Sequence, residues 1–175
     1  MQKIMFDDNF QLTRAVQEGW KNMTRRIAKS EKPRYKVGEI VAVAQRYQQV
    51  LDEHSGKDDI GVWAKIIANT ENACPGYYNK MFVRADLMPT RIRITAWRRE
   101  RLQEISDEDC LKEGIEEYAP CSECGADLYS FEGADDTYYS PRDAYADLVK
   151  KMSGKRAWDD NPYVDVYEFE LVKCV

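Results

Sequence analysis

Three segments of this chain of 175 residues carry strand patterns, and the unequal distances between them limit the folds it can adopt. Ile40 to Ala44 is a short apolar run, and Arg91 to Trp97 alternates at a period of two. Tyr163 to Val172 is rich in Val, Tyr and Phe, which favour strands. Regular βαβ winding would space the strands more evenly. The pattern predicts an α+β fold, a small mixed barrel or curled sheet with flanking helices.

Helices are predicted where a polar residue that can cap a helix is followed, several residues later, by a glycine that can end it. The three predicted segments run from Asn9 to Gly19, from Ser106 to Gly114 and from Ser140 to Gly154. The third has the strongest start, because a proline at position 141 follows the serine cap. These helices are expected to flank the sheet.

Two irregular segments interrupt this order, at about residues 47–80 and 116–139. Both contain turn-forming residues, and the second is strongly acidic. A chain of this length most often forms one domain with a real core. We therefore expect a single domain over residues 1–175, with insertions at these two places.

Composition and the first residues of the sequence predict the location of the protein and the state of its cysteines. The longest apolar runs are only a few residues, so no membrane span and no membrane partner are predicted. The first residues lack the pattern of a secretory signal, which predicts a cytoplasmic location. Five cysteines in such a chain favour reduced thiols or a metal over a disulfide framework.

Charge is distributed unevenly. Residues 1–50 hold ten Lys and Arg against five Asp and Glu, whereas residues 104–136 hold one Lys against twelve acids. Proteins that grip long duplexes usually carry a general basic excess, because phosphate neutralisation dominates that affinity. The net charge of −5 disfavours that class and leaves a local basic pocket for one nucleotide or anion open.

The segment Lys21 to Arg26 crowds three cations around the hydroxyl of Thr24. On a helical turn Lys21 and Thr24 would share a face, whereas on a strand this spacing would put them on opposite faces. We expect a basic turn after the first helix. It could activate a nucleophile, hold an anion or be a solvated loop.

A second candidate site is Cys121-Ser122-Glu123-Cys124-Gly125, the form of a zinc half-site. A structural zinc needs four ligands, and Cys74, in a Pro-Gly turn of the other irregular segment, is the best third candidate. The alternative is a pair of free thiols. His54, the single histidine, is expected to be a solvated loop residue.

Four segments then carry a family resemblance. Gly19 to Arg26 reads G-x-K-x-x-T-x-R, and Tyr35 to Glu39 reads Y-x-x-G-E. Arg101 to Ile115 reads R-L-x-x-I-S-x-E-D-x-x-x-E-G-I, and Asn161 to Phe169 reads N-P-x-V-x-V-x-x-F. Together with their flanks they cover roughly half the chain and resemble the ASCH family, in the form of its larger phage and prophage-type members. The resemblance implies a PUA-like β-barrel.

The family suggests several functions. Some compact members remove the acyl group from N4-acylated cytosine nucleosides without a cofactor, and their reacting residues correspond to Lys21, Thr24 and Glu113. Other PUA-like members bind RNA, and a non-catalytic RNA- or nucleotide-binding module would here use Lys21, Arg25, Arg26 and Arg93 as phosphate contacts. A third possibility, beyond these two classes, is a phage accessory protein that acts through protein contacts, with the acidic segment 116–139 as its surface.

The chemistry of amide hydrolysis fits the first class. The Thr24 hydroxyl is a weak nucleophile until a base removes its proton. Lys21 can be that base if its pKa is lowered, which nearby arginines favour. Glu113 could carry a proton to the leaving amine, and Arg26 or a backbone N–H could stabilise the oxyanion. These roles require the three residues to converge on one cleft.

Overall fold

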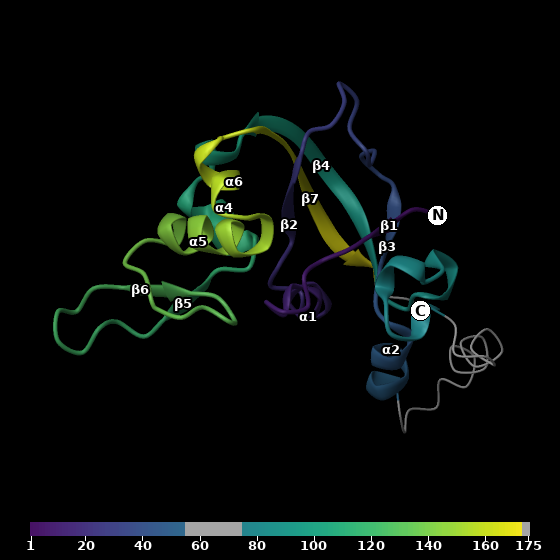
Figure 1. Cartoon of the computed structure of the whole chain (residues 1–175), viewed down its shortest axis with the longest axis horizontal. Helices are drawn as coiled ribbons and strands as arrows, with labels where there is room; N and C mark the ends of the chain where they lie inside the picture. Colours follow the sequence, from purple (N-terminus) through teal and green to yellow (C-terminus); the bar gives the residue numbers. More distant parts are fainter. Residues whose placement is uncertain (55–74, 173–175) are drawn as a thin grey trace. The chain divides into compact units, whose positions relative to one another are not determined.

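The computed structural model describes residues 1–54 and 75–172. The chain divides into two compact units. One contains residues 1–6, 39–93 and 171–175, and the other contains residues 7–38 and 94–170. Helices and strands occur together in a mixed α+β architecture, which confirms the predicted fold class (Figure 1).

Five strands form one sheet in the order β1-β3-β4-β7-β2. β1 and β3 are parallel, whereas β3 with β4 and β2 with β7 are antiparallel. No pairing that closes this sheet into a barrel is found within the described residues. The strands are β1 (Lys3–Ile4), β2 (Met23–Ile27), β3 (Ile40–Val43), β4 (Arg91–Arg101) and β7 (Tyr163–Val172).

The unit that holds β1 and β3 has its own core. Helix α2 (Tyr47–His54) follows β3, and three short 3-10 turns lie at Pro75–Tyr77, Lys80–Phe82 and Ala85–Leu87. Tyr47 is buried in this core, and its hydroxyl accepts a hydrogen bond from the backbone N–H of Arg84 at 2.9 Å. The expectation of an irregular segment from residue 47 is wrong for α2, and residues 55–74 lie outside the described part.

The other unit carries the remaining helices. α4 and α6 both pack against α5, and the hairpin β5–β6 lies beside α5 (Figure 1). Their apolar faces meet in one core cluster that includes Met23, Ile105, Phe131, Leu148 and Val166. The elements are α1 (Leu12–Glu18), α4 (Asp107–Lys112), β5 (Glu116–Tyr118), β6 (Leu128–Ser130), α5 (Pro141–Ser153) and α6 (Arg156–Asp159).

The predicted helix ends are confirmed where a local cap defines them. The hydroxyl of Ser106 accepts the N–H of Asp109, and the hydroxyl of Ser140 accepts the N–H of Asp143, both at 3.2 Å. Gly19 ends α1 with a φ of 86°, which a glycine adopts without strain. α1 starts later than predicted, because the backbone at position 11 is left-handed with a φ of 48°.

Two sequence expectations differ from the structure. The segment after α1 is a strand and not a basic turn, since Thr24 pairs with Tyr167 and Arg25 with Val166 across the β2–β7 ladder. The acidic segment 116–139 also contains the β5–β6 hairpin. In both places pairing with a partner strand outweighs a local sequence that is charged and turn-rich.

Truncating the buried face of α5 tests this packing. Leu148 is 1% exposed, so Leu148→Ala should lower the free energy of unfolding by about 2–5 kcal/mol. Met152, on the same helix, is 37% exposed, and Met152→Ala should cost well under half of that. Urea denaturation followed by circular dichroism measures both. Equal losses would contradict the assignment of the buried face.

Candidate functional site

The chain brings Lys21 and Glu113 together through two tight turns. After α1, the backbone N–H of Lys21 bonds back to the carbonyl of Ala15 at 3.0 Å. Glu113 caps the C-terminal end of α4, and Gly114 follows with a φ of 110°. A Cβ at position 114 would lie 3.1 Å from Leu12 and 3.7 Å from the Lys21 side chain. The glycine therefore permits both the backbone conformation and the close approach.

Lys21 and Glu113 form a buried ion pair. The Lys21 Nζ donates to Glu113 Oε2 at 2.7 Å and also to the backbone carbonyl of Glu113. Their side chains are 2% and 5% exposed. That carbonyl lies at the C-terminal end of α4, where the helix dipole favours a cation. The lysine is thus held by a carboxylate and a helix end together.

The surroundings of Lys21 favour its neutral amine more than water does. Burial lowers the pKa of Lys21, because it disfavours the ammonium form. The charge and hydrogen bond of Glu113 act in the opposite direction, while Arg26 and Arg25 add to the lowering. The net direction is downward, as a proton acceptor at this position requires.

Arg25 sits at the centre of a buried cluster of carboxylates. Its Nη2 donates to Glu100 at 2.7 Å and to Asp109 at 2.8 Å, and its Nη1 donates to Glu113 at 3.3 Å. Only 1% of the side chain is exposed. Burial would lower the pKa of Arg25, but the charge of Glu113, together with Tyr145 and these hydrogen bonds, raises it above its ordinary value. Arg25 is therefore permanently charged and holds Glu113 in place.

Thr24 and Arg26 lie on the other face of β2, because successive side chains of a strand alternate. Thr24 is buried opposite Tyr167. Burial lowers the pKa of Arg26, although the charges of Tyr35 and Glu113 oppose this. The charge of Glu113 therefore acts to raise the pKa of both Arg25 and Arg26, which lie on opposite faces of β2. β2 is the last strand in the sheet order.

Sequence reasoning missed two members of this cluster, Glu100 and Arg98. Arg98 binds Glu100 at 2.8 Å and also contacts Asp109 and Glu168. Arg98 and Glu100 are two residues apart on one strand and therefore share a face. This spacing of opposite charges was the sequence signal that could have identified them. Asp109, in the first turn of α4, is a third member that sequence reasoning did not place here, and its carboxylate binds Arg25.

Arg93, which was also predicted to contact phosphate, is not a member of this cluster. Arg93 is exposed on β4, opposite Ile40, and belongs to the other unit. The structure therefore groups Lys21, Arg25 and Glu113, puts Thr24 and Arg26 on the same strand as Arg25, and does not group Arg93 with them.

The cysteine motif forms a tight turn. The N–H of Gly125 bonds to the carbonyl of Cys121 at 2.7 Å, and the N–H of Cys121 bonds to Ala126 at 2.8 Å. Backbone N–H groups of Cys124 and Glu123 lower the pKa of Cys121 by hydrogen bonding to its sulfur. Cys74, the third predicted ligand, lies outside the described residues. Among residues 1–54 and 75–172, no three His, Cys, Asp or Glu side chains form a group that could hold a metal.

Comparison of the chain with family models, with curated proteins and with solved structures finds no match. Of the helices in the described part, none has the length and apolarity needed to span a membrane.

Removing the central cation should destabilise the fold. Arg25→Met removes the partner shared by the buried Asp109 and Glu113 and the partly buried Glu100, and we expect a loss of about 3–5 kcal/mol in the free energy of unfolding. Arg84→Met removes an exposed ion pair with Asp86 and should cost at most about 1 kcal/mol. Chemical denaturation compares them. Similar small losses would mean that the cluster contributes nothing net.

Acid should weaken the same cluster. Burial would raise the pKa of Asp109, but the hydrogen bond and charge of Arg25, with Arg98 and Lys112, hold it below its ordinary value of 3.8. A lowered folded-state pKa adds stability above the unfolded value, and this is lost as pH falls through the folded value. Below about pH 4, the free energy of unfolding should therefore fall less steeply with decreasing pH in Asp109→Asn than in the unaltered protein. The exposed Asp127→Asn should leave the slope unchanged.

Proposed function

We propose that this chain is an ASCH-like domain of the PUA-like class that binds an N4-acylated cytidine, free or within RNA, and hydrolyses its amide. The contact between Lys21 and Glu113, two buried residues 92 positions apart, carries the proposal. The family resemblance assigns reacting roles to these two residues and to Thr24. The contact of Lys21 with Glu113 is part of what that assignment requires, and a surface basic turn would not produce it. Thr24, which lies on β2 three residues after Lys21, enters the proposed site through the resemblance.

Thr24 is the nucleophile in this proposal. Its hydroxyl oxygen attacks the acyl carbon of the substrate while its proton passes to the neutral amine of Lys21. The bond between the acyl carbon and N4 then breaks, and N4 takes a proton from the Lys21–Glu113 pair as the cytosine amine leaves. An acyl ester remains on Thr24. Water hydrolyses this ester, which releases a carboxylic acid and returns the proton to Thr24.

Two features support these roles. Burial lowers the pKa of Lys21, so a site closed by substrate favours the amine that accepts the proton. The Glu113 carboxylate is held by Arg25 as well as by Lys21, which fixes its position between β2 and the end of α4. A fixed proton carrier in a dry site contributes on the order of 10²–10⁴-fold to the rate.

Binding of RNA without catalysis fits the geometry less well. Phosphate contacts were expected at Arg25, but its guanidinium already binds three carboxylates and is 1% exposed. Engaging a phosphate there would break those ion pairs. The basic residues of β2 therefore serve the interior of the site more than its surface.

Release of cytidine from N4-acetylcytidine, measured by chromatography, tests the proposal. Lys21→Ala, Thr24→Ala and Glu113→Gln should each lower kcat/KM by at least about 100-fold. The exposed Lys32→Ala and Thr95→Ala serve as matched controls and should keep full activity. Circular dichroism confirms that each variant is folded.

Substrate is offered both as the nucleoside and as an acetylated RNA oligonucleotide. Absence of turnover with both, or retained turnover in Lys21→Ala and Thr24→Ala, would refute the hydrolase. Salt-dependent binding of the oligonucleotide without turnover would instead identify a binding module.

A further inference from the structure

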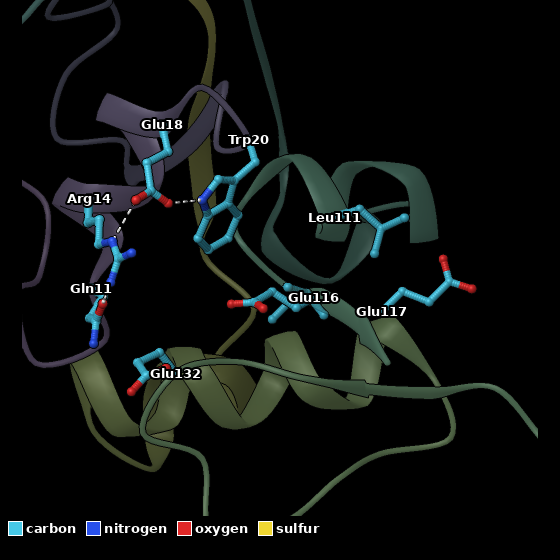
Figure 2. Close-up of a pocket in the computed structure, with 9 residues that line it drawn as sticks. Gln11, Arg14, Glu18, Trp20, Leu111, Glu116, Glu117 and Glu132 are labelled. Atoms are coloured by element: carbon cyan, nitrogen blue, oxygen red, sulfur yellow. Dashed lines mark hydrogen bonds and ion pairs between the residues drawn. The ribbon is translucent and has the colours of Figure 1, made fainter. Parts of the chain in front are cut away.

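An open cavity of about 600 Å³ lies within the unit of residues 7–38 and 94–170, outside the ion-pair cluster. One part of its lining is apolar, formed by Trp20, Leu111 and Ile115. The other part carries glutamates from α1, from β5 and from the loop after β6 (Figure 2). Its volume is within the range of sites for small organic molecules.

The aromatic wall is held in place by hydrogen bonds. The Trp20 Nε1 donates to Glu18 Oε2 at 3.2 Å, and Glu18 Oε1 accepts from Arg14 Nε at 2.6 Å (Figure 2). These two hydrogen bonds fix the edge of the indole and leave its ring facing the cavity. They also pair Arg14, the arginine that lines the cavity, with the Glu18 carboxylate.

Negative charge remains in the cavity. Glu116 extends beneath the Trp20 ring, and Glu132 lies on the side of Arg14 (Figure 2). Within the described part of the chain, neither Glu116 nor Glu132 forms an ion pair. Burial raises the pKa of Glu116, and the charges of Glu132 and Glu18 raise it further. Carboxylates crowded in this way are relieved by a cation.

We propose that this cavity binds a small organic cation of the alkylamine class. Its ammonium group lies between Glu116 and Glu132, against the face of Trp20, and its alkyl chain packs on Leu111 and Ile115. An aromatic face attracts such a cation. Among the described residues no three His, Cys, Asp or Glu side chains form a group that could hold a metal ion, so a metal ion fits this cavity poorly. Anions, including nucleotide phosphates, are repelled.

Titration of the protein with putrescine, followed by calorimetry and by the indole N–H resonance of Trp20, tests the proposal. Trp20→Phe assigns that resonance. We expect saturable binding of one equivalent, weakened about tenfold by Glu116→Gln and further by Glu132→Gln. Glu108→Gln is the matched control, because this exposed glutamate on α4 does not line the cavity.

Two probes separate the ligand class from simple charge. Magnesium chloride supplies charge without an alkyl chain, and 1,4-butanediol supplies the chain without charge. Neither should shift the Trp20 resonance at the concentration that saturates putrescine. Equal binding of magnesium, an equal loss in Glu108→Gln, or no binding of putrescine at millimolar concentration would each overturn the proposal. None of these outcomes depends on hydrolase activity.

Discussion

The buried guanidinium of Arg25 is the interaction on which the rest of the site depends. A charge removed from water costs several kcal/mol unless partners replace its hydration. Arg25 recovers this with carboxylates from β4, from α4 and from the residue that caps α4, namely Glu100, Asp109 and Glu113. One side chain on β2 therefore fixes how a strand and a helix, distant in sequence, meet it.

Glu113 links this structural cluster to the proposed chemistry. One oxygen accepts from Arg25 and the other from Lys21. Because Arg25 stays charged, it still holds the Glu113 carboxylate when Lys21 loses its proton in the proposed reaction. Had Lys21 been the single partner of Glu113, loss of that proton would have left a buried carboxylate unpaired. With two cations on one carboxylate, Glu113 keeps a partner in the proposed reaction.

The parts of the fold that were predicted from sequence are those encoded within a few residues. Ser106, Ser140 and Gly19 act locally, through a side-chain cap or a backbone conformation, and the structure confirms them. β2 was missed because its ladder partner, around Tyr167, lies about 140 positions away. A charged strand whose pairing is entirely remote carries no local signal that distinguishes it from a turn.

The same distinction applies to the site. Glu113 was named in the sequence through the family resemblance. An acid at a helix C-terminus opposes the dipole, and only the tertiary structure supplies the lysine that offsets it. Arg25 read as a free cation, since the acids that neutralise it lie 75 to 88 positions away. The residues next to a charged side chain in the sequence do not show whether it is free to bind a ligand or is paired with residues that are distant in the sequence.

The proposed site and the cavity share two turns of the backbone. Trp20 precedes Lys21, and Glu116 lies two residues after Gly114, where an added Cβ would lie 3.7 Å from both the lysine and the indole. On one side of these turns Lys21 and Glu113 form an ion pair, whereas on the other Glu116 and Glu132 form none within residues 1–54 and 75–172. A conformational coupling between the cavity and Lys21 requires a difference in affinity between two positions of this backbone. The tight approach at Gly114, where a single methyl group would already lie 3.1 Å from Leu12, leaves little space for a second position. Close packing therefore disfavours conformational coupling of the two sites, and a cation in the cavity would act on Lys21 through its charge.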